Sequence, residues 1–326
     1  MGTSYAAYLS SLLLFGSNGI VAALVALPSS NIVVARTGLG AALLGVLLVG
    51  AALARRAAKR NGAAPARAGR LSDGESRALV CFALSGAALG AGWIVLFEAY
   101  RLVGVGTASL LYYCGPIIVM AAAPLLFKER LTAAKMGGFA AVALGAFLVS
   151  AQALEGGSDP RGLLLGGVSA LAYAVMVVCT KKAASFCPNV AERGLRNAFV
   201  QLAAAFAVAA ALAAAVQGPG ALLVPVAPGD AAPLLMLGLV NTGVGCFLYF
   251  TSVGRLPVQT VAVCGYVEPL SAVLLSALLL GEPLGAVQIA GALLIVGGAA
   301  FCELSGRLRA ARRLDLAASL EASAGR

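Results

Sequence analysis

The chain has 326 residues, of which 61% are hydrophobic and 11% are charged, whereas soluble domains are about 45–50% apolar and about 25% charged. These values exclude an ordinary soluble domain, because so few polar residues cannot cover the surface of a core of this size. The net charge of +10 does not indicate nucleic-acid binding, since the basic residues lie in short segments between long uncharged runs.

Ten runs of about 20 mostly apolar residues, each long enough to cross a bilayer as a helix, follow one another along the chain. The first five are expected near residues 5–27, 33–54, 78–100, 104–127 and 133–153. The second five are expected near residues 163–180, 197–217, 231–253, 258–280 and 285–304. These runs lack the alternation of membrane β-barrel strands. The sequence therefore predicts an all-α integral membrane protein with ten transmembrane helices.

The basic residues indicate how the spans are oriented. Most of the 23 Lys and Arg residues lie in the loop 55–77, in the other loops on the same side and in the tail 305–326. Placing the N-terminus inside leaves only Arg36, Arg101 and Arg161 outside. Because cytoplasmic loops are enriched in Lys and Arg, both termini are expected in the cytoplasm, with the spans in the cell membrane.

The residue inventory argues against catalysis. The chain has no histidine, which removes histidine-based catalytic triads, proton relays and most zinc sites. Its seven cysteines are scattered without a C-x-x-C pair, so free thiols are expected, and no phosphate-binding loop occurs. We expect no enzyme activity, no cofactor and no metal site.

Landmark residues recur at a spacing of 153 positions. Pro116 matches Pro269, and the other matched pairs are Tyr113 and Tyr266, Glu129 and Glu282, Gly138 and Gly291, and Gly145 and Gly298. The two copies, 1–153 and 163–304, each contain five predicted spans, so the second copy must enter the membrane from the opposite face. Inverted repeats of this kind are a recurrent plan of transporters. The pattern therefore predicts a site that opens alternately to the two sides.

These features resemble the EamA-like ten-helix group of the drug/metabolite transporter superfamily. The resemblance rests on the segment Phe15 to Asn18, on Arg36 at the start of the second span, and on the paired segments Pro116 to Leu131 and Pro269 to Leu284. It implies a permease with a central cavity lined by spans one, three, four, six, eight and nine, in a group that commonly moves amino acids or other metabolites outward. The sixth span lacks the Gly-Ser-Asn of the first, which argues against its contribution to the pocket.

Charged groups within spans are functional candidates, because a charge in hydrocarbon costs at least about 2.5 kcal/mol. Glu268, just before Pro269, is the first candidate, either as a ligand for a substrate ammonium group or as a proton carrier. Contact between helices is the alternative role. Glu98 and Arg36 are expected at the outer mouth, where Glu98 pairs with Arg101 or with Arg36.

Polar and aromatic side chains complete the predicted substrate site. Asn18 and Asn241 need partners inside the bundle, either another helix or a bound substrate. Aromatic residues in spans three, four, eight and nine are expected to give the cavity an apolar wall with a few hydroxyl groups: Trp93, Tyr112, Tyr113, Tyr249 and Tyr266. Anchoring at the membrane interface is the alternative role for Trp93 and Tyr249.

The expected partners are a small-molecule substrate and the lipid bilayer. Protons are a candidate coupling ion, a homodimer is a candidate assembly, and nucleic acid is not expected. An uncoupled channel, a membrane sensor or scaffold, and an integral-membrane enzyme are the alternatives to a permease. The enzyme lacks a catalytic cluster, and neither the loop 55–77 nor the tail is long enough for a signalling domain.

Overall fold

The computed structural model describes residues 2–60, 72–115, 133–186, 194–220, 226–253, 267–281 and 285–298, with positions 118, 119, 122, 126, 300, 301 and 305. These residues form helices and short turns, with no strand among them. Six helical segments are long and apolar enough to cross a membrane: Ser4–Ala23, Ser29–Ala54, Asp73–Val103, Pro160–Ala183, Gly194–Gln217 and Pro228–Tyr249. The helical membrane class is confirmed. The expected total of ten spans stays a prediction, because several of the expected spans include residues outside the described part of the chain.

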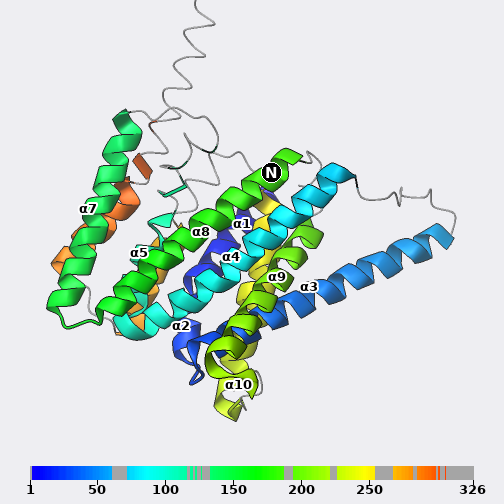
Figure 1. Cartoon of the computed structure of the whole chain (residues 1–326), viewed down its shortest axis with the longest axis horizontal. Helices are drawn as coiled ribbons and strands as arrows, with labels where there is room; N and C mark the ends of the chain where they lie inside the picture. Colours follow the sequence, from blue (N-terminus) through cyan, green and yellow to red (C-terminus); the bar gives the residue numbers. More distant parts are fainter. Residues whose placement is uncertain are drawn as a thin grey trace, which may run out of the picture.

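The first half of the chain contributes six labelled helices (Figure 1). They are α1 (Gly2–Gly16), α2 (Asn18–Ala23), α3 (Ser29–Arg60), α4 (Asp73–Val103), α5 (Val105–Tyr112) and α7 (Ala133–Glu155). A capping box starts α4, because the Ser72 side chain accepts from the Glu75 backbone N–H while the Glu75 carboxylate accepts from the Ser72 N–H. The C-terminal part of α3 extends beyond the other helices.

The second half contributes α8 (Pro160–Phe186), α9 (Gly194–Gln217), α10 (Pro228–Leu235), the π-helix η3 (Met236–Val244), α11 (Gly245–Val253) and α13 (Val267–Leu279). A further apolar helix covers Ala286–Gly298. The segments α10, η3 and α11 are continuous, so the predicted span 231–253 is a single helix with a π-helical middle. Such wide turns occur frequently at functional sites.

Glycines bring neighbouring helices into backbone contact. A Cβ atom added to Gly86 of α4 would lie 2.1 Å from the carbonyl oxygen of Gln201 in α9. One added to Gly90 would lie 2.4 Å from the carbonyl oxygen of Ala205. Because these two glycines are four residues apart, they lie on one face of α4. The small residues allow the close helix packing that drives association in membranes.

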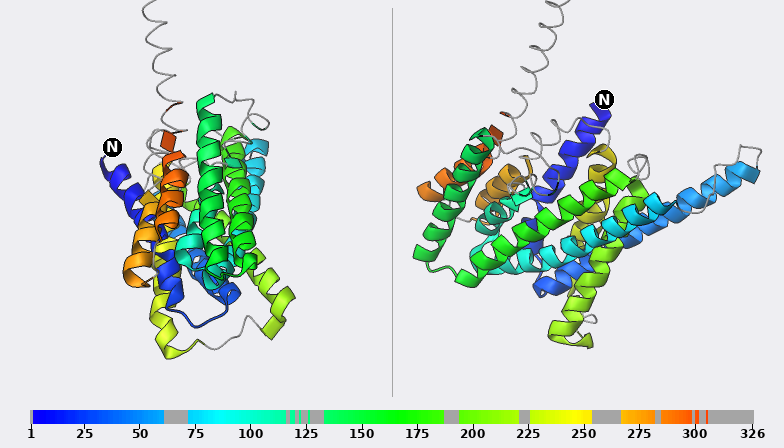
Figure 2. Two further views of the ribbon diagram at one scale, coloured as in Figure 1. Left: turned by 90° about the vertical axis from the view of Figure 1, so that its left-hand side faces the viewer. Right: turned by 45° about the horizontal axis from the view of Figure 1, so that its top comes forward.

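Helix contacts recur in reciprocal pairs between the two halves. Helix α4 packs on α8 and α11 packs on α1, while α4 packs on α9 and η3 packs on α3. Helix α7 meets the helix Ala286–Gly298, and both views of Figure 2 show them together. A Cβ atom on Gly145 would lie 2.6 Å from the Gly291 carbonyl oxygen, and one on Gly298 would lie 3.0 Å from the Gly138 carbonyl oxygen. The contact of Gly145 with Gly291 is therefore repeated by their counterparts in the other copy, Gly298 and Gly138.

Several polar residues are buried and many large apolar residues are exposed. Arg36, Gln201 and Asn241 have no exposed surface, whereas Val46 is 70% exposed and Phe147 is 67% exposed. A soluble protein of this size would bury its large apolar side chains instead. The distribution suits a bundle whose outer surface faces lipid and whose interior satisfies its own polar groups.

Candidate functional site

The first span is interrupted between α1 and α2, at Ser17. The carbonyl oxygen of Leu14 accepts from the Ser17 hydroxyl at 2.8 Å and from Nδ2 of Asn241 at 2.9 Å. The same Nδ2 lies 2.9 Å from Ser17 Oγ and 3.2 Å from Asn18 Oδ1. Asn241 of η3 thus satisfies the polar groups at the interruption. It holds the start of α2, and with it the Asn18 side chain, in a fixed position.

Arg36 is fully buried in α3, about two turns from the start of that helix at Ser29. Its Nε donates to Thr242 Oγ1 at 2.9 Å and its Nη2 donates to Asn18 Oδ1 at 3.0 Å. The guanidinium carbon lies 4.1 Å from the centroid of the Trp93 ring and 5.0 Å from that of Phe97. Stacking on aromatic faces favours a desolvated cation.

The π-helix explains how Thr242 reaches Arg36. The Thr242 hydroxyl donates to the Leu237 carbonyl oxygen, five residues earlier, at 2.7 Å, and accepts from Arg36. In η3 three successive residues, Asn241, Thr242 and Gly243, are buried. Neighbouring positions on a regular helix are separated by about 100°, and the wider turn directs both polar side chains toward α1 and α3.

Glu268 lies in the first turn of α13 and is partly buried. Its side chain lies near the phenol group of Tyr113 in the first half. Its backbone carbonyl accepts from Ser271 Oγ at 2.8 Å. A Cβ atom on Gly16 would lie 3.0 Å from that carbonyl oxygen, so the end of α1 approaches the start of α13 closely. Glu268 is therefore held where spans from the two halves meet.

Both charged groups line one central cavity of about 80 Å³. Its wall is mainly aromatic and contains Phe15, Trp93, Phe97, Tyr100, Tyr112, Tyr113, Tyr173 and Tyr249, with Asn18, Ser109 and Cys246. Tyr112 contacts Tyr173 edge to face, with ring centroids 5.3 Å apart. The first half contributes α1 to α5 and the second contributes α8, α11 and α13. This volume holds a few water molecules, so a larger solute requires the halves to move apart.

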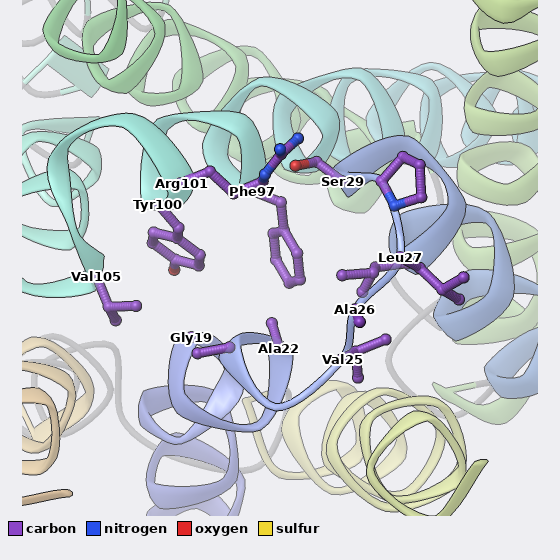
Figure 3. Close-up of a pocket in the computed structure, with 13 residues that line it drawn as sticks. Gly19, Ala22, Val25, Ala26, Leu27, Ser29, Phe97, Tyr100, Arg101 and Val105 are labelled. Carbon is purple, nitrogen blue, oxygen red and sulfur yellow. The ribbon is translucent and has the colours of Figure 1, made fainter. Parts of the chain in front are cut away.

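A second cavity of about 520 Å³ adjoins it at the end of the bundle where α2 and the C-terminus of α4 lie, which we call the α2 end. Figure 3 shows Phe97 and Tyr100 extending from α4 toward Gly19 and Ala22 of α2. The two aromatic rings, with centroids 5.2 Å apart, line both cavities. They therefore separate the central cavity from the larger space at the α2 end.

Six residues predicted for the substrate site line the central cavity together: Asn18, Trp93, Tyr112, Tyr113, Tyr249 and Glu268. Asn241 does not line it, because its amide is used between helices. Tyr266 lies outside the described residues. Tyr173 and Met176 of α8 do line the cavity, so the argument against the sixth span was wrong. The span reaches the cavity through a tyrosine instead of a Gly-Ser-Asn segment.

The prediction that Arg36 lies at the outer mouth was also wrong. It rested on a span that begins near residue 33, whereas α3 begins at Ser29, which places Arg36 deeper in the bundle. Glu98 accepts from Ser29 Oγ at 2.7 Å and forms an ion pair of 3.4 Å with Arg101. Both side chains of that pair are more than one-third exposed, so Glu98 lies at the α2 end.

Four of the contributors that were not among the predicted site residues carry a hydroxyl group: Tyr100, Ser109, Tyr173 and Thr242. Tyr100 and Tyr173 are tyrosines within spans, like those that were predicted, so composition alone did not distinguish them. Ser109 and Thr242 are common helix residues in membranes. Their roles depend on tertiary contacts that leave no local signal.

Comparison with known proteins supports the same class of molecule. A family model described as the EamA-like transporter family matches residues 3–151 and matches again over residues 160–303. No curated protein matches significantly. A solved structure described only as a crystal structure of a protein is 19% identical, covers 94% of this chain and 98% of its own, and superposes with a TM-score of 0.56, which supports the fold alone. Because the family model covers almost the whole chain in two copies, the chain belongs to the EamA-like transporter family, whose members are membrane transporters of small solutes.

Proposed function

We propose that the chain is a permease that moves a small metabolite, an amino acid or a related compound, outward across the cell membrane by alternating access. The observation that carries the proposal is the central cavity, which both halves enclose and which contains a buried cation and a carboxylate. Ionisable groups inside a membrane are costly, and they mark substrate or ion pathways. An inert bundle has no need of either group.

Alternating access requires two halves that exchange roles, and two inverted five-helix repeats, 1–153 and 163–304, provide them in this proposal. The reciprocal contacts of Gly145 with Gly291 and of Gly298 with Gly138 support it, since a pseudo-twofold axis relates such pairs. The matching landmarks at a spacing of 153 residues support it independently. The distribution of Lys and Arg among the loops supports a cytoplasmic location for both termini in this proposal.

Glu268 is the proposed ligand for a substrate ammonium group or for a coupling proton. It lies beside Tyr113, and the tyrosine hydroxyls of the cavity offer further polar contacts. No Lys or Arg among the described residues forms an ion pair with it. A carboxylate without a fixed cationic partner is suited to bind a cation that arrives and leaves, either the substrate amine or a proton.

The cavity at the α2 end is the proposed continuation of the pathway. With the N-terminus in the cytoplasm, the α2 end faces outward. Phe97 and Tyr100 lie between this cavity and the central one, so movement of these two rings would connect the site to the outside. The outward direction of net transport rests on the resemblance to the family.

Uptake of a labelled panel of amino acids and related metabolites into proteoliposomes tests the proposal, with and without a pH gradient. A permease gives saturable flux that is accelerated by unlabelled substrate on the opposite side. Flux that never saturates would indicate a channel instead. Absence of protein-dependent flux for the whole panel would leave a sensor or scaffold and would overturn the transporter proposal.

A further inference from the structure

The buried guanidinium of Arg36 lacks a compensating anion in the described structure. Arg36 has no exposed surface, and it remains charged because the guanidinium group does not lose its proton in proteins. Its described hydrogen-bond acceptors, Thr242 Oγ1 and Asn18 Oδ1, are neutral. The ion pair in the described part of the chain joins Arg101 to Glu98 instead. A desolvated cation without a counter-ion is costly, so this position favours an anion.

The fixed geometry of Arg36 leaves one nitrogen available for that anion. Nε is held by Thr242, Nη2 is held by Asn18, and the ring of Trp93 supports one face of the guanidinium. Nη1 is buried and has no hydrogen-bond partner in the described structure. Buried polar groups are normally hydrogen-bonded, and an unsatisfied one in a native protein requires an explanation. Contacts that hold the rest of the group in place also reduce the entropy lost on binding a ligand.

We infer that Arg36, through Nη1, binds the carboxylate of the transported molecule. The inference rests on the proposed function and specifies the chemistry of its site. Arginine is suited to carboxylates, because its charge strengthens each hydrogen bond that it donates. Glu268 lines the same cavity and repels a second carboxylate, so the ligand is a monocarboxylate whose other end is neutral or cationic. The cavity of about 80 Å³ must widen to admit any molecule larger than a few waters.

The chain provides a reporter for this site, because Trp93 is its only tryptophan and lies against the Arg36 guanidinium. Trp93 emission is measured in the purified full-length protein during titration with propionate and alanine, which carry a carboxylate. Propionamide and alaninamide serve as the matched ligands without a carboxylate, and chloride serves as the simple anion. The expected result is a saturable change with both carboxylates and an affinity for the amides that is about tenfold to hundredfold weaker.

Two variants add a matched comparison. Arg36→Gln should abolish the carboxylate response, whereas Arg101→Gln, at the exposed ion pair of the α2 end, should retain it. If Arg36→Gln does not fold, the comparison of acids with amides in the unmodified protein still tests whether the site binds a carboxylate. Equal responses to acid and amide, an equal response to chloride, or no response to either carboxylate would overturn the inference.

The flux assay separates this inference from the proposed function. Saturable flux in proteoliposomes without preference for carboxylates would overturn the role of Arg36 and leave the permease intact. A carboxylate-specific Trp93 response without flux of any compound would overturn the permease and leave the anion site. The two measurements can therefore refute the anion site and the permease independently of each other.

Discussion

Replacement of Thr242 by valine tests how the π-helix supports the site. The substitution keeps the shape of the side chain and removes its hydroxyl, which accepts from Arg36 Nε at 2.9 Å and donates to Leu237 at 2.7 Å. A hydrogen bond to a charged group contributes about 1.5–3 kcal/mol, and one between membrane helices averages about 0.6 kcal/mol. Because Arg36 Nη1 is already without a partner in the described structure, the variant leaves a second guanidinium nitrogen, Nε, without an acceptor. We expect a loss of about 2 kcal/mol in unfolding free energy.

The assay is unfolding of the purified protein by a denaturing detergent, followed by Trp93 emission, with Thr242→Ser as the matched variant. Serine keeps both hydrogen bonds and removes one methyl group, which costs about 0.8 kcal/mol. The valine variant should therefore be the less stable of the two. It should also bind carboxylates more weakly, whereas the serine variant should bind them as the unmodified protein does. If valine is no more destabilising than serine and leaves binding unchanged, the proposed support of Arg36 by η3 is refuted.

Three further predictions concern packing and access. Gly90→Ala should destabilise the protein by about 1–3 kcal/mol, because the new Cβ would lie 2.4 Å from the Ala205 carbonyl oxygen. Gly297→Ala, with no atom within 4 Å, should not destabilise it, and thermal unfolding that ranks the two equally would contradict this account. Cys246 is 3% exposed and lies in the cavity wall, so thiol labelling should be slow in a variant that keeps only this cysteine. Bound substrate should slow the labelling further. Rapid labelling with or without substrate would argue against the cavity. Adding Tyr100→Ala to that variant should speed the labelling, and an unchanged rate would show that this ring does not separate the two cavities.

Hydropathy predicts the six long apolar helices of the described residues well, because a helix in lipid must be apolar over a fixed length. It predicts their ends less well, since polar turns extend some helices beyond the apolar run. The second span was expected from residue 33, yet Ser29, Ser30 and Asn31 already belong to α3. Those polar residues are buried by tertiary contacts, such as the bond from Ser29 Oγ to Glu98. The error of four residues placed Arg36 at the mouth instead of inside the bundle.

The site was predictable where its residues are unusual in a membrane. Glu268 and Trp93 stand out in apolar spans, and both line the central cavity. Asn18 and Asn241 also stood out, but sequence did not reveal which would face the cavity and which would bond another helix. Which asparagine faces the cavity depends on the interruption after α1 and on the π-helix. No local sequence pattern predicts either of these two features.

We claim that the cavity enclosed by both halves is the transport site. The decisive test measures the flux of the best substrate of the panel in proteoliposomes. It compares the unmodified protein with Glu268→Gln and Glu98→Gln. Loss of a charged contact in that cavity should reduce saturable flux at least about tenfold in Glu268→Gln. Glu98→Gln, which changes a partly exposed carboxylate at the α2 end, should retain nearly full flux. Equal flux in the unmodified protein and in Glu268→Gln would contradict the claim.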